Sequence, residues 1–69
     1  MPLAVAPLNT KLKVIKILGD DLRGHLENLN LNVDDEITIL SIDNDNLVCL
    51  VANSKIVIDK NSAIKILVA

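Results

Sequence analysis

His25 and Cys49 are the single histidine and the single cysteine of this 69-residue sequence, and both residue types can bind metals or act in catalysis. A structural zinc site needs about four nitrogen or sulfur ligands, and a catalytic zinc site needs about three protein ligands. We therefore predict no metal site. His25 is expected at the surface, and Cys49, which lies within an apolar run, is expected to be a small buried side chain.

Segment 43–46, with the sequence Asp-Asn-Asp-Asn, begins like the oxygen-rich front of a calcium-binding loop. Such a loop needs glycine at its sixth position and glutamate at its twelfth, where this chain has Val48 and Ser54. Asn and Asp tolerate positive φ and bond their own backbone, so we predict a hairpin turn here. The acidic segment 34–36 is predicted to be a solvated loop.

Catalysis needs a nucleophile beside a base, paired carboxylates in a cleft, or a glycine-rich loop that binds phosphate. None of these patterns is present, and the chain has only two glycines. A domain of only 69 residues is filled by its own side chains and leaves no room for a large internal cavity. We therefore predict that the protein is not an enzyme and uses no cofactor.

Composition favours a β-rich fold and disfavours several partners. Hydrophobic residues make up 51% of the chain, mostly Ile, Leu and Val, and there is no aromatic residue. Branched aliphatic side chains favour strands. The formal net charge of −2 and the missing aromatic residues argue against binding to nucleic acid, which needs basic surfaces and base-stacking side chains.

The chain has no apolar run of the roughly 18 residues that a membrane-spanning helix needs, so we predict no direct insertion into a membrane. The apolar opening segment 1–8 lacks the basic residues and the length of a signal peptide. A lone cysteine is compatible with a reducing compartment.

Alternating and β-branched patterns predict five strands. The predicted strands are 12–18, 36–43, 47–52, 55–59 and 64–68. The first strand changes phase between Val14 and Ile15, and the second between Ile39 and Leu40, which indicates a bulge or bend in each. Tight turns at 43–46 and 53–54 join the middle strands into hairpins, and one turn of 3₁₀ helix is expected at 60–63.

A short helix is expected after the break at residues 19–21. Leu22, Leu26 and Leu29 fall at i, i+4 and i+7, which places them on one helix face. Asn30 suits a left-handed cap, and Leu31 is expected to close back against the last turn.

Five short strands cannot bury their apolar side chains in a flat sheet, and closing the sheet also removes exposed edges. We therefore predict a mainly β fold, a small five-stranded SH3-like barrel with one short α-helix after the first strand. The barrel is expected to form a single domain over residues 1–69.

Residues 22–34 have the sequence Leu-Arg-Gly-His-Leu-Glu-Asn-Leu-Asn-Leu-Asn-Val-Asp. This segment resembles the motif Leu-Arg-x-x-Leu-x-x-Leu-Gly-Leu-x-x-Gly of the ferrous iron transport protein A (FeoA) family, and residues 63–68 resemble its closing Ala-x-x-Ile-x-Val. Asn9, Asn30 and Asp34 stand where the family pattern has glycine. Among residues other than glycine, Asn and Asp adopt left-handed backbone most readily. Each of the three turns is therefore expected to keep its conformation.

The resemblance implies a cytoplasmic bacterial accessory that assists a membrane permease, ferrous iron transport protein B, by binding its cytosolic nucleotide-hydrolysing region. It implies no iron ligation by this chain. The alternative is an SH3-like regulatory or peptide-binding domain linked to a metal-dependent transcriptional repressor, because the same fold occurs in such proteins.

The interaction surface is expected on the appended helix and on the tip of the first hairpin, because loops and helices on a rigid barrel usually carry function. The candidate partner-binding residues are Arg23, His25, Glu27, Asp43, Asn44, Asp45 and Asn46. The alternative for each is ordinary solvated surface. Apolar residues on both faces of the third and fourth strands leave weak self-association open.

Overall fold

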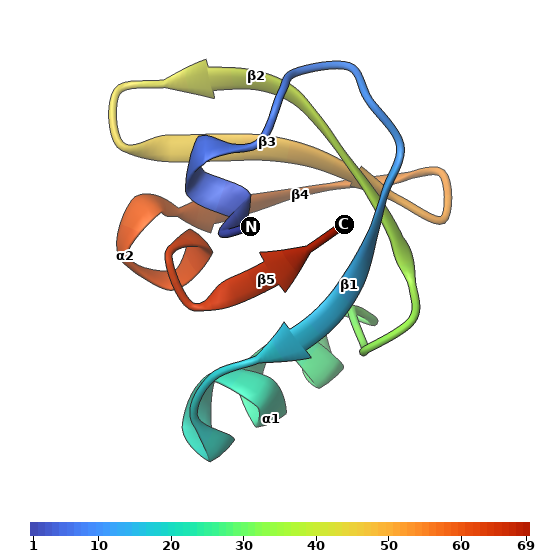
Figure 1. The fold of residues 1–69 in the computed structure, drawn as a ribbon, viewed down its shortest axis with the longest axis vertical. Helices are drawn as coiled ribbons and strands as arrows, with labels where there is room; N and C mark the ends of the chain where they lie inside the picture. Colours follow the sequence, from blue (N-terminus) through green and yellow to red (C-terminus); the bar gives the residue numbers. More distant parts are fainter.

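Five antiparallel strands form one curled sheet in the order β4-β3-β2-β1-β5 in the computed structural model, which describes residues 1–69 (Figure 1). The strands are β1 (Leu12–Ile17), β2 (Glu36–Asp43), β3 (Asn46–Val51), β4 (Ser54–Asp59) and β5 (Ile66–Val68). A 3₁₀ turn η1 (Leu3–Val5) precedes them, α1 (Asp20–Asn28) follows β1, and α2 (Lys60–Ala63) joins β4 to β5. The predicted small SH3-like barrel with one short helix after the first strand is confirmed.

Two bulges bend the sheet where the apolar pattern changes phase. In β1, Val14 pairs with Val68 and Lys16 with Leu67, so Ile15 is the extra residue. In β2, the register shifts between Ile39 and Ser41. A bulge increases the local twist and bends a strand, which lets these short strands curl around one core. Both predicted bends are confirmed.

The core contains only apolar side chains and Cys49, and no buried polar or charged residue. Leu3 is fully buried and Ala6 is nearly so. The opening segment, which lies outside all the predicted strands and the predicted helix, thus supplies part of the core. In a chain without aromatic residues, this additional aliphatic burial matters because a domain of this size buries only about 60% of its unfolded surface.

Left-handed backbone occurs at the three positions where the family pattern has glycine. The φ angles are 57° at Asn9, 64° at Asn30 and 77° at Asp34. The short polar side chains of Asn and Asp make this region more accessible to them than to other non-glycine residues. The expectation that these turns survive is confirmed.

Helix α1 begins after Gly19, whose φ of 96° allows the sharp turn from β1, and it places Leu26 in the core. Leu22 packs against the core and is partly buried, but Leu29 is 36% exposed. The apolar stripe is thus shorter than predicted, because α1 ends at Asn28 and Leu29 is already in the cap. Leu31 is buried and its N–H donates to the Leu26 carbonyl at 2.9 Å, as expected.

The β3–β4 hairpin turns one residue earlier than predicted. Its two turn residues are Ala52 (φ 49°) and Asn53 (φ 66°), so Ala52 leaves β3 and Ser54 joins β4. This register places Leu47 opposite Ile58, both buried. A turn one residue later would place Leu47 opposite the exposed Lys60. Pairing of buried side chains thus outweighs the cost of a left-handed alanine.

Replacing Ala52 with glycine is expected to stabilise the protein by about 1 kcal/mol, because an L side chain pays roughly this cost at positive φ. The free energy of unfolding from denaturant titration checks this. Ala63→Gly makes the same change in helical backbone and is expected to destabilise by about 1 kcal/mol. Destabilisation by both variants would contradict the strain assigned to Ala52.

The last strand is shorter than predicted, and the turn before it is α-helical. The Ile64 N–H donates to the Lys60 carbonyl at 3.0 Å, an i to i−4 bond, so residues 60–63 form α2 rather than a 3₁₀ turn. Ile64 caps α2 and is half exposed instead of sharing a buried face with Ile66.

The prediction that closure removes exposed edges is wrong for one strand. The strand order leaves β4 and β5 at the two ends of the sheet. The N-terminal segment covers β5, because Pro2 bridges Leu67 and the Val68 N–H donates to the Met1 carbonyl at 2.7 Å. No segment pairs with the outer edge of β4.

Candidate functional site

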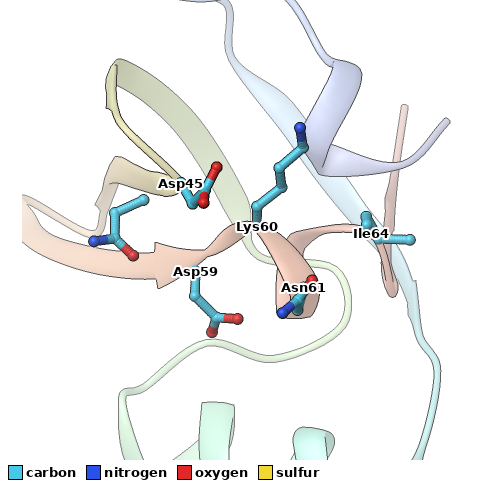
Figure 2. Close-up of a pocket in the computed structure, with 6 residues that line it drawn as sticks. Asp45, Asp59, Lys60, Asn61 and Ile64 are labelled. Carbon is cyan, nitrogen blue, oxygen red and sulfur yellow. The ribbon is translucent and has the colours of Figure 1, made fainter.

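An open depression of about 310 Å³ lies where the β2–β3 turn meets α2 (Figure 2). It is lined by Asp45, Asn46, Asp59, Lys60, Asn61 and Ile64. Figure 2 shows the Lys60 side chain extending on one side of the junction between β4 and α2, and the Asp59 carboxylate on the other. We call this surface the hairpin depression.

Backbone bonds tie the two walls of the hairpin depression together. The Lys60 N–H donates to the Asp45 carbonyl at 2.7 Å, which links α2 to the β2–β3 turn. That turn needs left-handed backbone at Asn44 (φ 57°), as its Asn and Asp residues led us to expect. The backbone that carries these charged side chains is therefore held in one conformation.

Asp59 ends β4 and caps α2. Its carboxylate accepts hydrogen bonds from the Ser62 hydroxyl at 2.8 Å and from the Ser62 N–H at 3.2 Å. The hydroxyl bond is the main reason that the pKa of this carboxyl lies below its usual 3.8. Since the folded pKa is lowered, the contribution to stability is present above the unfolded pKa and is lost as the pH falls through the folded pKa.

Replacing Asp59 with alanine is expected to destabilise the protein by about 1 kcal/mol at neutral pH, because the helix loses its N-cap. Asp59→Asn is the matched control, since an asparagine side chain can still accept from the Ser62 N–H. Denaturant titration of both variants checks this. A loss in Asp59→Asn as large as that in Asp59→Ala would indicate that charge, rather than the capping bond, carries the effect.

The predicted partner-binding residues separate into two distant groups. Asp45 and Asn46 line the hairpin depression, and Asp43 and Asn44 are exposed beside them. The turn itself is shorter than predicted, because Asp43 ends β2 and pairs with Asn46, the first residue of β3. Arg23, His25 and Glu27 are exposed on α1. Figure 1 places α1 and the β2–β3 turn at opposite ends of the molecule, so the structure does not bring the two groups into one site.

On α1, Arg23 forms an exposed ion pair with Asp20 in the same helix. This pairing leaves less of the Arg23 guanidinium free for a partner. The His25 side chain makes no hydrogen bond within the protein. Exposed ion pairs contribute little to stability, so the pair mainly fixes the orientation of Arg23.

Groups with metal-binding or nucleophilic chemistry are not gathered in one place. The structure has no group of three or more His, Cys, Asp or Glu side chains placed to hold a metal ion. Cys49 is fully buried in β3, and burial raises the pKa of its thiol from 9.0 to about 11. The thiol is thus protonated and inaccessible at neutral pH.

No helix is both long and apolar enough to cross a membrane.

The family model of the FeoA domain matches residues 1–69, the whole length of the chain. This chain belongs to the FeoA domain family. Membership places it among proteins of ferrous iron uptake. No curated protein matches the sequence.

Solved FeoA structures share the fold closely. The chain is similar to an iron uptake regulatory protein (FeoA) with a TM-score of 0.88 and 25% identity, over 99% of this chain and 92% of the other. It is also similar in fold to the FeoA protein of Chlorobium tepidum (TM-score 0.88, 18% identity, 99% and 68% covered). The FeoA-like protein of Clostridium acetobutylicum has a TM-score of 0.88 and 22% identity over 100% of this chain and 84% of its own length.

Sequence reasoning missed the α2 side of the hairpin depression. The sequence patterns place Asp59 and Ile64 in strands, and Lys60 and Asn61 in the turn between them. The signal that could have identified this wall is Asp59 three residues before Ser62, a spacing typical of a helix N-cap. Recognising the cap would also have moved Ile64 out of the last strand.

Proposed function

We propose that this FeoA-family chain is a cytoplasmic, non-enzymatic accessory of ferrous iron uptake that binds the cytosolic nucleotide-hydrolysing region of the permease, ferrous iron transport protein B. The observation that carries the proposal is the FeoA domain match over residues 1–69. An exposed surface of charged and amide side chains on a fixed frame supports contact with another protein.

Within the proposal, the hairpin depression is the contact surface. It offers two carboxylates, two amides and the half-exposed Ile64, and its two acidic side chains outnumber the single ammonium group of Lys60. Protein interfaces combine apolar anchors with a polar rim. This surface suits a partner segment that presents one apolar side chain next to a basic one.

Helix α1 is the competing surface. Its exposed residues are polar, and Arg23 is already paired with Asp20. The hairpin depression is favoured because its backbone is tied between β2, β3 and α2, whereas α1 carries its charges on a single exposed helix face. Pre-ordered contact groups lose less conformational entropy on binding.

Isothermal titration calorimetry of the chain against the isolated cytosolic domain of the permease tests the proposal, with and without guanine nucleotide. We expect saturable binding, and a nucleotide dependence would point to regulation of transport. Absence of binding in every nucleotide state would count against the proposal.

Charge reversals at the two surfaces locate the contact. Asp45→Lys is expected to weaken binding about tenfold or more, because a rim charge then opposes the basic group of the partner. Glu27→Lys makes the same change in charge on α1 and is expected to leave binding unchanged. The opposite result would move the contact to α1.

A further inference from the structure

Strand β4 has an outer edge that no segment covers. It pairs with β3 along its whole length, from Ser54 opposite Val51 to Asp59 opposite Asn46. The other end of the sheet, β5, is bridged by the N-terminal segment. Figure 1 shows that segment beside β5, with α2 connecting β5 to the end of β4.

Turn geometry identifies which backbone groups point to this edge. The two-residue turn makes Val51 and Ser54 a hydrogen-bonded pair, and such pairs then alternate along an antiparallel ladder. Ile56 and Ile58 therefore direct their N–H and C=O groups to β3. Lys55 and Val57 direct theirs away from the sheet, and no bond outside the ladder uses them.

The side chains along the free edge alternate in the same way. Lys55, Val57 and Asp59 are exposed, and Val57 is 60% exposed, whereas Ile58 is buried and Ile56 packs against the core. The edge thus presents an apolar residue between a basic and an acidic one.

We propose that β4 pairs with β4 of a second copy of this chain, antiparallel and about a two-fold axis at Val57. In this register Val57 lies opposite Val57 of the second copy, and Lys55 lies opposite Asp59 of the second copy. The two-fold axis repeats the same contact, which gives two opposite-charge pairs. Opposite charges directly across strands stabilise a pair, and like charges destabilise it.

The backbone allows the register that the charges favour. With Val57 on the axis, the residue can exchange both N–H···O bonds with its own copy, because its groups point to the free edge. The Asp59 carboxylate holds Ser62 yet has further lone pairs for the ammonium group of Lys55. A protective edge would instead carry charges of one sign, which repel a second copy.

Ring or fibre growth through β5 is blocked at the other end of the sheet. A head-to-tail contact would need β4 of one copy to add to β5 of the next, but the N-terminal segment occupies that edge. An isologous contact uses the same edge in both copies and closes as a dimer. The dimer shares Asp59 with the permease contact at the hairpin depression, whereas Lys55 and Val57 belong to the dimer contact alone.

Sedimentation velocity from micromolar to millimolar concentration tests the dimer. We expect reversible dimerisation of the unaltered chain. Lys55→Glu is expected to raise the dissociation constant about tenfold or more, because both charge pairs become repulsive. Lys16→Glu makes the same change in charge on β1 and is expected to dimerise normally.

Mixing two variants gives the sharpest readout. Lys55→Glu and Asp59→Lys should each be monomeric alone, yet a mixture should form a heterodimer, because both charge pairs are restored between unlike copies. Circular dichroism checks that each variant is folded. Val57→Pro should also abolish dimerisation, because it removes an N–H that points to the free edge and leaves the ladder to β3 intact.

A chain that stays monomeric at millimolar concentration would overturn the proposal. So would a dimer that persists in both Lys55→Glu and Val57→Pro, or a mixture of the two charge variants that fails to associate when each is folded.

Discussion

Replacing Leu3 with alanine is expected to lower the free energy of unfolding by about 2–5 kcal/mol, the usual cost of truncating a buried leucine. Leu3 is fully buried in η1, although the opening segment has no regular strand or long helix. For a domain of this size, such a loss is a large part of the total stability. Denaturant titration measures it.

Val5→Ala is the matched control, because Val5 lies in the same 3₁₀ turn but is 72% exposed. Its effect is expected to stay within about 0.5 kcal/mol. Similar small losses in both variants would show that the opening segment is not part of the cooperative core.

Raising the pH from neutral to about 11 is expected to remove about 2–3 kcal/mol of stability through Cys49 alone. Burial raises the pKa of this thiol from 9.0 to about 11, and each pH unit between the two values corresponds to about 1.4 kcal/mol. The unfolded chain ionises first, so stability is intact below pH 9 and falls as the pH rises toward the folded pKa.

Denaturant titrations across this pH range check the prediction. Lysine titration also contributes there, so Cys49→Ala, which keeps every lysine, is the reference. We expect the unaltered chain to lose stability more steeply with pH than Cys49→Ala. Parallel pH profiles would contradict the burial effect, whatever the difference in stability at neutral pH.

Local patterns were enough to predict most of the barrel. The bounds of β2 were predicted correctly. The phase changes near Ile15 and Leu40 located both bulges, because a shift of one residue would turn the following side chains to the other face of the sheet unless a bulge takes up the extra residue. The left-handed turns at Asn9, Asn30 and Asp34 were expected from the resemblance to the FeoA pattern, which has glycine there, and from the tolerance of Asn and Asp for this backbone.

Features that depend on contacts between distant segments of the chain could not be predicted from the local sequence. Ala52 occupies a turn because Leu47 must lie opposite Ile58 across the hairpin. Leu3 is buried because the N-terminal segment lies against β5, at the far end of the sequence. Neither contact can be recognised from the pattern of residues next to it in the sequence.

The candidate site was predicted only in part for the same reason. Asp45 lies in a recognisable turn and Asn46 directly follows it, but their neighbours in space come from α2, which follows β4. The backbone bond between Lys60 and Asp45 joins elements separated by two strands. A surface assembled in this way appears only when the sheet order is known.

Co-purification with the full-length permease tests the central claim most directly. The tagged chain is expected to retain detergent-solubilised ferrous iron transport protein B, and Glu27→Lys is expected to retain it equally well. Asp45→Lys should retain much less. Failure of the unaltered, folded chain to retain the permease in any nucleotide state would contradict the proposed accessory role.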